Sequence, residues 1–210
     1  MSDKTFTILV ASRNKGKIRE IKRIFTEIAP GSSWLFLSAD EVGLSKIEET
    51  GATFLENAQI KALAAARKSG MIALGEDSGL EVDKLGGAPG VCSHRFSPSG
   101  DDHDNNELLL KKLEGVPLNE RTARYRCAVV VAGPRGVLAQ SQGVVEGLIL
   151  DRYRGKNGFG YDPLFYCPEL GKTFGEATDS EKDRVSHRRR ALEGLVPTLV
   201  KVLSERSTMK

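Results

Sequence analysis

The order of hydrophobic and polar positions predicts a strand and then a helix near the start of the chain. The apolar run Phe6 to Ala11 is typical of a buried strand, and a polar loop follows it. Five apolar residues then recur at helical spacing: Ile18, Ile21, Ile24, Phe25 and Ile28. Pro30-Gly31 is expected to end this helix, so the chain opens as strand, loop and helix.

A second helix and a second strand are predicted next. Thr53 and Glu56 have the spacing of a capping box at the start of an alanine-rich helix over residues 53–68. The apolar run Met71 to Leu74 predicts a buried strand. That strand leads directly into the polar sequence Gly75-Glu76-Asp77-Ser78-Gly79.

The rest of the chain predicts a third helix, a long hairpin and a final helix. The third helix is expected to start at Asp104, which opens an acidic variant of the capping pattern. From Ala123 to Val145 the alternation has the period of a strand, and the turn sequence Gly133-Pro134-Arg135-Gly136 interrupts it, which predicts an antiparallel hairpin. The final helix is expected over residues 186–203, with Pro197 as a candidate kink point.

These elements predict a single mixed α/β domain over residues 1–210, with two lobes around a cleft. The composition, 40% hydrophobic and 28% charged, excludes a disordered chain, a collagen and a coiled coil. No stretch approaches the roughly 20 apolar residues that a membrane span needs.

Charge and cysteine content narrow the compartment and the partners. The chain has 31 lysine and arginine residues against 28 acidic ones, and the net charge of +3 argues against coating nucleic acid by bulk charge. Cys92, Cys127 and Cys167 are widely spaced, which favours a reducing compartment over disulfides or a structural zinc site. The segment Met1 to Thr5 lacks the apolar run of a signal peptide, so a cytoplasmic location is expected.

The polar loop before the first helix is the first candidate site. It consists of Ser12, Arg13, Asn14, Lys15, Gly16 and Lys17. Backbone N–H groups at a helix N-terminus attract phosphate, and the two lysines add charge where the helix dipole is already positive. The loop is not a Walker A motif, because Ala11 and Ile18 stand where that motif requires glycine and a hydroxyl residue. The alternative is a solvated helix start that Ser12 caps.

Carboxylates form the second candidate site. Glu76 and Asp77 follow the second predicted strand, and Glu48 and Glu49 precede the second helix. Open α/β sheets bind ligands at strand ends, and Mg²⁺ takes one or two protein carboxylates together with substrate phosphate oxygens. Carboxylates facing a phosphate loop therefore suit Mg²⁺. The alternative is a plain acidic turn formed with Ser78-Gly79.

A glycine-rich stretch over residues 155–163 is the third candidate. It contains Phe159, Gly160, Tyr161 and Asp162. An aromatic face in such a loop can stack on a nucleobase, and the carboxylate can accept from a purine N–H. The alternative is a glycine-rich hairpin turn whose aromatic residues belong to the core.

Basic residues before and at the last helix are the fourth candidate. Lys182, His187 and Arg188 are donors suited to a keto oxygen of a base or to phosphate oxygens. The alternative is a solvated, basic first turn of that helix.

Taken in this order, the segments resemble the inosine triphosphate pyrophosphatase family. The matching residues are Ser12, Asn14, Lys17, Glu20, Glu48-Glu49-Thr50-Gly51, Glu56-Asn57-Ala58, Lys61-Ala62, Asp77-Ser78-Gly79-Leu80, Leu85 to Gly90, Phe159 to Pro163, Glu181-Lys182 and Ser186-His187-Arg188. The match spans about residues 8 to 192, and the ordered set is far more specific than any single segment.

The resemblance implies an enzyme that depends on Mg²⁺ and hydrolyses ITP, dITP and XTP to the monophosphate and pyrophosphate. Such an activity removes deaminated purines from the nucleotide pool. The resemblance also implies a homodimer and an elongated α/β fold, a mixed sheet with flanking helices and two lobes around the substrate cleft. With the near-balanced charge and the lack of an apolar span, no nucleic-acid or membrane partner is expected.

The resemblance further implies a role for each matching residue. Asp77 is the implied proton acceptor and a metal ligand, and Glu48 is the other implied metal carboxylate, with Glu49 as the alternative. The implied triphosphate contacts are Ser12 to Lys17, Lys61 and Ser78. The implied base contacts are Phe159, Gly160, Tyr161, Asp162, Lys182, His187 and Arg188.

Two other functions stay open. One is a related pyrophosphatase that acts on other modified nucleotides. The other is a nucleotide-binding or RNA-binding module without catalysis, in which Arg121, Arg124 and Arg126 form a basic strip. Because these arginines alternate with apolar residues, the polar face of a strand is the favoured interpretation of the strip.

Overall fold

The structure is a computed structural model that describes residues 5–30 and 33–208. Two sequence predictions fall partly outside the described residues. They concern Gly31, at the predicted end of the first helix, and residues 1–4, in the segment that lacks the apolar run of a signal peptide. The chain divides into two compact units. Unit 1 takes in the described residues of Met1–Asp77, Cys127–Gly143 and Arg188–Lys210, and unit 2 consists of Ser78–Arg126 and Val144–His187.

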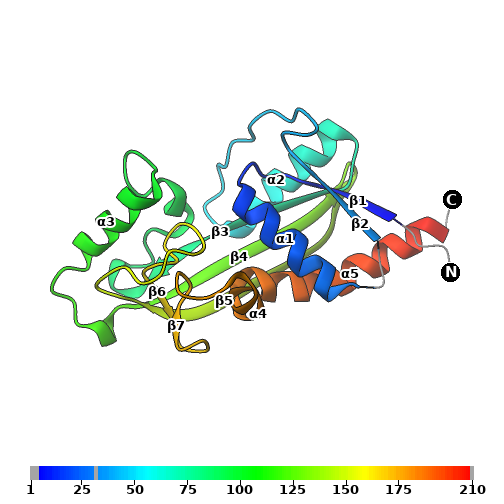
Figure 1. Cartoon of the computed structure of the whole chain (residues 1–210). Coiled ribbons are helices and arrows are strands. Elements are labelled where there is room, and N and C mark those ends of the chain that lie inside the picture. Colours follow the sequence, from blue (N-terminus) through cyan, green and yellow to red (C-terminus); the bar gives the residue numbers. More distant parts are fainter. Residues whose placement is uncertain (1–4, 31–32, 209–210) are drawn as a thin grey trace. The chain divides into compact units, whose positions relative to one another are not determined.

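In the described residues, seven strands form one mixed sheet in the order β2-β1-β3-β4-β5-β6-β7 (Figure 1). Their bounds are β1 Thr5–Val10, β2 Ser33–Ser38, β3 Ala73–Val82, β4 Thr122–Gly133, β5 Gly136–Ile149, β6 Phe165–Cys167 and β7 Lys172–Thr173. β1 pairs in parallel with both β2 and β3, whereas β6 pairs antiparallel with β5 and β7. The mixed α/β fold class predicted from the sequence is confirmed.

Five α-helices accompany the sheet in the described part of the chain. Their bounds are α1 Lys15–Ile28, α2 Phe54–Ser69, α3 Asp102–Lys112, α4 Asp179–Val185 and α5 His187–Thr208. Short 3-10 helices lie at Asp83–Leu85, Gly90–Arg95 and Leu118–Glu120. None of the described helices is both long enough and apolar enough to cross a membrane.

Several predicted elements are confirmed with small shifts at their ends. The predicted capping box of α2 is present. The Thr53 side chain accepts from the backbone N–H of Glu56, and the Glu56 carboxylate accepts from the backbone N–H of Thr53. The predicted hairpin is β4 and β5, joined by Pro134-Arg135. Pro197 lies inside α5, and a kink there stays a prediction.

Three boundaries were predicted wrongly. β3 does not end at Leu74 but continues to Val82, so Glu76 and Asp77 lie inside a strand, neither at its end nor in a turn. α3 begins at Asp102, because the Asp101 side chain caps it by accepting from the backbone N–H groups of two later residues. The final helix predicted over residues 186–203 is α5, which begins one residue later, at His187, whereas the short helix α4 before it was not predicted; Ser186, in extended conformation, separates the two.

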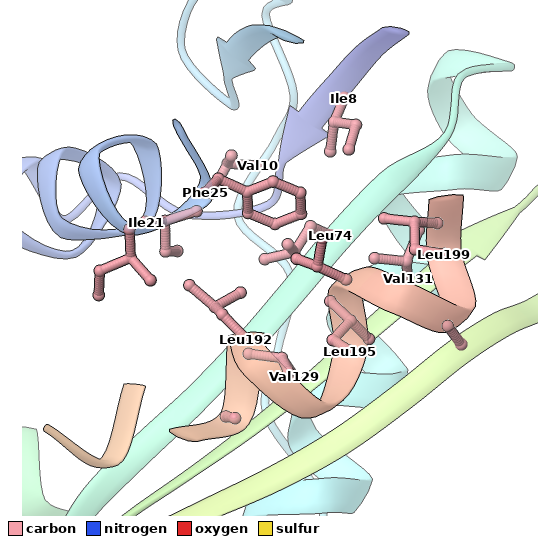
Figure 2. Packing of buried hydrophobic residues seen from close by; sticks show 14 of the residues in the cluster. Ile8, Val10, Ile21, Phe25, Leu74, Val129, Val131, Leu192, Leu195 and Leu199 are labelled. Atoms are coloured by element: carbon pink, nitrogen blue, oxygen red, sulfur yellow. The ribbon is translucent and has the colours of Figure 1, made fainter. Parts of the chain in front are cut away.

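The core of unit 1 lies between helices α1 and α5 and strands β1, β3 and β4. Figure 2 shows Ile21 and Phe25 of α1 and Leu192 and Leu195 of α5 gathered around Leu74 of β3. These five side chains are fully buried, with no exposed surface. The helical spacing of the apolar residues in α1 therefore has the expected consequence, a buried face against the sheet.

The core of unit 2 is rich in aromatic rings. Tyr125 of β4 packs on Phe165 with ring centroids 4.7 Å apart, and Phe165 packs on Phe174 at 5.1 Å. Leu109 and Leu113, from α3 and its C-terminal end, belong to the same buried cluster. This packing attaches α3 to the sheet strands of its own unit.

A close backbone approach fixes the distance between α2 and β3. A Cβ added to Gly75 would lie 2.1 Å from the carbonyl oxygen of Ala58 and 2.6 Å from the nitrogen of Ala62. Both obstacles are backbone atoms of α2, so a side chain at this position would push the helix from the strand. The spacing matters for function because the two residues after Gly75 are Glu76 and Asp77.

We expect Gly75→Ala to lower the free energy of unfolding by about 1–3 kcal/mol or more, because the strand must move away from α2. Gly194→Ala is the matched control: its Cβ would meet mainly the side-chain oxygen of Ser141, at 2.4 Å, which can rotate away. In α5 that change is expected to be neutral or to stabilise by up to about 1 kcal/mol. Urea denaturation measures both, and equal stability of the two variants would contradict the close approach.

Candidate active site

The predicted phosphate loop in unit 1 is ordered by its own side chains. Asn14 caps α1 by accepting from the backbone N–H of Lys17 at 3.0 Å, and Ser12 accepts from the backbone N–H of Asn14 at 3.2 Å. The cap is therefore Asn14, not Ser12. Arg13 donates to Asp40 at 2.8 Å, while Lys15 is exposed. No acidic side chain lies in the first turn of α1 to offset its positive end.

Glu76 is a fully buried carboxylate held by two cations. It pairs with Lys17 of α1 at 2.8 Å and with Arg188 of α5 at 2.9 Å. Arg188 is 1% exposed and pairs also with Glu20 of α1. Burial alone would raise the pKa of Glu76, but Lys17 and Arg188 hold that pKa well below its usual value. Glu76 is thus kept charged by side chains from α1 and α5.

Asp77, the next residue in β3, makes its contacts with α2. One carboxylate oxygen accepts from Lys61 at 3.1 Å and the other accepts from the Asn57 amide at 3.2 Å. Adjacent strand residues point to opposite faces of a sheet, so the two acids contact different helices. Burial raises the pKa of Asp77 above its ordinary value, despite the lowering effect of Lys61.

Glu49 reaches the same cation as Asp77. Its carboxylate lies 3.2 Å from Lys61, so one ammonium group joins Glu49 and Asp77. Glu48 is exposed and makes no ion pair in the part of the chain that the structure describes. Of the two adjacent glutamates that the sequence left open, the structure therefore brings Glu49 toward Asp77.

Asn57 connects these groups and was not among the predicted site residues. Its side-chain oxygen accepts from the backbone N–H of Gly51 at 2.8 Å while its amide donates to Asp77. The residue is 1% exposed. It therefore ties the loop that carries Glu49 to the strand that carries Asp77. Its place in the matching segment Glu56-Asn57-Ala58 was the available signal.

The residues around Asp77 fit a magnesium ion. Among the described residues no group of three or more histidine, cysteine or acidic side chains could enclose a metal alone. Mg²⁺ commonly takes one or two carboxylates and leaves its other positions to water and substrate phosphate. Asp77 and Glu49, two carboxylates that converge on one ammonium, supply that number of ligands.

The predicted base-binding residues of unit 2 are brought together around Asp162. Its carboxylate accepts from Lys182 of α4 at 2.6 Å and from the backbone N–H of Phe159 at 2.9 Å. The Lys182 ammonium lies 4.6 Å from the centroid of the Phe159 ring. A donor, an acceptor and an aromatic face are therefore grouped within this unit.

Two other predicted base contacts have structural partners in unit 2. Tyr161 is 3% exposed, and its hydroxyl donates to the backbone oxygen of Ser93 at 2.8 Å. His187 is 4% exposed and stacks on Tyr125 with centroids 4.8 Å apart and an interplanar angle of 11°. Tyr161 belongs to the buried cluster of unit 2, as the alternative interpretation of the glycine-rich stretch expected. His187 packs against Tyr125 of the same cluster.

Adjacent residues of the predicted motif belong to different units. His187 is in unit 2, whereas Arg188 is in unit 1 with Glu20 and Glu76. Ser78 follows Asp77 in β3 as the first residue of unit 2 and is partly buried. The assigned roles of these residues toward substrate stay predictions.

The arginines of the candidate RNA-binding strip have protein partners. Arg121 is 8% exposed and donates to the backbone oxygens of Leu113 and Val116, each at 2.9 Å. Arg124 pairs with Asp83 and Glu146, and Arg126 pairs with Glu81 at 2.6 Å. Arg124 and Arg126 lie in β4, so their contacts support the interpretation of these two positions as the polar face of a strand. Arg121 is buried and lies just before that strand.

Comparison with known proteins gives consistent matches over most of the chain. A model of the Ham1 family matches residues 8–198. A dITP/XTP pyrophosphatase from Desulforamulus reducens is 47% identical over 188 residues, covering 89% of this chain and 92% of the relative. One from Listeria monocytogenes is 45% identical over 199 residues, covering 94% of this chain and 97% of the relative.

Solved structures match as well. A HAM1 protein from Coxiella burnetii has a TM-score of 0.81 at 38% identity, covering 95% of this chain and 99% of its own. A nucleoside-triphosphatase, dITP/XTP pyrophosphatase, from Mycobacterium abscessus has a TM-score of 0.71 at 40% identity, covering 89% and 97% respectively.

We expect Arg188→Met to lower the free energy of unfolding by about 3–5 kcal/mol, because it leaves Glu20 and Glu76 buried without their shared cation. The neighbouring change Arg189→Met is the matched control. Arg189 pairs with Glu27 and Glu193, whose side chains are 53% and 50% exposed, and such a pair contributes about 0–1 kcal/mol. Urea denaturation measures the free energy of unfolding of both variants. Similar decreases in the two would show that the buried pairs of Arg188 contribute no more to stability than the exposed pairs of Arg189.

Proposed function

The chain belongs to the Ham1 family, and we propose that it hydrolyses ITP, dITP and XTP to the nucleoside monophosphate and pyrophosphate. The observation that carries this proposal is the convergence of Glu49 and Asp77 on Lys61 in unit 1. In the same unit, the N-terminus of α1 and Lys17 supply positive charge. Two carboxylates with nearby cations are what phosphoryl chemistry on a nucleoside triphosphate requires.

The phosphates would be bound by α1 and by lysine side chains. Backbone N–H groups at the start of α1 point out of the helix and favour negative charge. Lys15 and Lys17 lie in the first turn, and Lys61 lies on α2 beside Asp77. Because Lys17 is partly used by Glu76, Lys15 is the more available of the two for substrate.

Asp77 would orient the attacking water and accept its proton. The attack on the α-phosphorus breaks the bond to the bridging oxygen, and pyrophosphate leaves. Asn57 and Lys61 hold the two oxygens of Asp77 and so fix the direction of the carboxylate. Asp77 and Glu49 would hold Mg²⁺. Bound there, the ion supplies charge neutralisation and polarises the phosphate oxygens.

The base would be selected by Phe159, Asp162 and Lys182 in unit 2. Hypoxanthine and xanthine present a keto acceptor at position 6 and a donor at N1, whereas adenine presents the reverse pattern. Lys182 is a donor and Asp162 an acceptor, so they complement a keto purine. Because Lys182 and Asp162 are already bound to each other, adenine would bring its amino donor against the Lys182 ammonium and its N1 acceptor against the Asp162 carboxylate. Such mismatched contacts are costly in a buried site.

We extend the proposal to the assembly and its location. The family resemblance supports a homodimer that acts in the cytoplasm on free nucleotides, with no nucleic-acid or membrane partner. Light scattering of the purified chain would test the assembly, since a dimer has twice the mass of one chain.

The substrate assay measures pyrophosphate and orthophosphate separately from ITP, XTP, dITP, ATP and GTP, with and without Mg²⁺. We expect pyrophosphate from the first three, dependent on the metal. Asp77→Asn should lower turnover about 10²–10⁴-fold, the usual loss when a general base is removed, while substrate binding survives better. Asp83→Asn, which alters an exposed carboxylate paired with Arg124, is the control. Orthophosphate as the first product, or near-normal turnover by Asp77→Asn, would refute the proposal.

The two glutamates should separate in their need for metal. Glu49→Gln is expected to raise the Mg²⁺ concentration for half-maximal rate at least about tenfold, since it removes a proposed ligand. Glu48→Gln should leave that concentration within about twofold, because Glu48 points to no partner among the described residues. Magnesium titrations of the initial rate give this concentration for each variant. A larger increase in Glu48→Gln than in Glu49→Gln would show that Glu48, not Glu49, is the metal ligand.

A further inference from the structure

One residue of the irregular segment between β5 and β6 has both of its backbone polar groups bound by the same helix. The N–H of Gly160 donates to the Asp102 carboxylate at 2.8 Å. The carbonyl oxygen of Gly160 accepts from the Asn106 amide, also at 2.8 Å. Asp102 and Asn106 are four positions apart in α3 and so lie on one face of that helix. These two contacts are called the Gly160 clamp.

Asn106 contributes to the clamp through the N–H groups of its side-chain amide. Asn106 is 2% exposed, and its amide group also donates to the backbone oxygen of Asp102 at 2.8 Å. Its side-chain oxygen is buried and has no hydrogen-bond partner among the described residues. An unsatisfied buried acceptor lowers stability, so an apolar side chain would suit the packing better. The contribution of Asn106 is therefore the pair of hydrogen bonds that it donates.

Gly160 is a point where the loop would otherwise be free to change direction. Its φ of 61° lies in the left-handed region, and a Cβ placed there would meet no atom within 4 Å. No side chain of its own anchors this residue, and glycine has the widest range of backbone conformations. The clamp supplies the restraint from α3.

The clamp acts on the residues that face the proposed base. Phe159 comes directly before Gly160, and its own N–H is held by Asp162. The backbone that carries the Phe159 ring is thus held at two points. Asp162 binds the N–H of Phe159 itself, and α3 binds the N–H of the next residue, Gly160. A ring fixed before the ligand arrives loses less freedom on binding.

We propose that Asp102 and Asn106 are positioning residues for purine recognition, which act by holding Gly160 and with it the ring of Phe159. This inference rests on the proposed function, because it places the base at Phe159 and Asp162. Neither residue needs to touch the nucleotide. Base affinity should depend on the clamp, and affinity for the phosphate portion should not.

Calorimetric titration with IMP and with pyrophosphate separates these two affinities without turnover. Asp102→Ala and Asn106→Ala are each expected to weaken IMP binding about five- to tenfold, the effect of ordering a side chain at a binding surface. Pyrophosphate binding in the presence of Mg²⁺ should stay within about twofold of the wild type. Asp102→Asn keeps an acceptor oxygen for the Gly160 N–H and should restore most of the IMP affinity.

Asp104→Ala is the matched control for the charge of the helix start. Asp104 lies in the same first turn as Asp102 but accepts from Ser99 at 2.6 Å and makes no contact with Gly160. It should bind IMP like the wild type. Equal weakening by Asp102→Ala and Asp104→Ala would overturn the inference, since general destabilisation of α3 would then explain both.

Hydrogen exchange of residues 155–163 provides a readout that needs no ligand. Exchange should be faster in Asp102→Ala and Asn106→Ala than in Asp104→Ala, and unchanged exchange would overturn the clamp. The wild-type pyrophosphate assay separates the two proposals. Pyrophosphate release with unaltered IMP binding in the clamp variants would refute the inference alone. A wild type that neither binds IMP nor releases pyrophosphate would refute the proposed function and the inference with it.

Discussion

A carboxylate buried in the middle of a strand has to be paired, and Glu76 in β3 is the constraint on which unit 1 depends. Its side chain has no exposed surface, so its charge is stable only beside Lys17 and Arg188. Lys17 belongs to α1 and Arg188 to α5, and Glu20 of α1 completes the network on Arg188. One buried charge therefore connects two helices to β3.

The cations that pair with Glu76 are not the ones that bind Asp77, the next residue of β3. Strand geometry turns Asp77 to the opposite face, where α2 supplies Lys61 and Asn57. The close approach at Gly75 holds α2 near enough for these contacts. The two adjacent acids thus have separate tasks: Glu76 is structural and charge-balanced, and Asp77, with Glu49, is left to bind metal and water in the proposed reaction.

Sequence patterns were sufficient where the determinants are local. The apolar spacing in α1, the capping box of α2 and the turn between β4 and β5 are all set by neighbours in the chain. The family resemblance was confirmed as well, because its motifs are read in order along the sequence.

The errors arose where distant charges decide the structure. Glu76-Asp77-Ser78-Gly79 has the composition of a turn, yet it lies inside β3, where Glu76 is paired with α1 and α5 and Asp77 with α2. The sequence left Glu48 and Glu49 open as the second metal carboxylate, and the contact that distinguishes them is with Lys61, twelve residues after Glu49. Which of the two binds metal stays a prediction. Asp102 and Asn106 belong to no motif, because their partner Gly160 lies more than fifty positions away.

In the proposed reaction, water attacks the α-phosphorus of a keto-purine triphosphate. Hydrolysis of ITP in ¹⁸O-labelled water, with Mg²⁺ present and mass spectrometry of both products, tests it most directly. We expect one ¹⁸O atom in IMP and none in pyrophosphate, since the water oxygen becomes part of the monophosphate. Label in pyrophosphate or in orthophosphate would place the attack on another phosphorus and refute the proposed reaction.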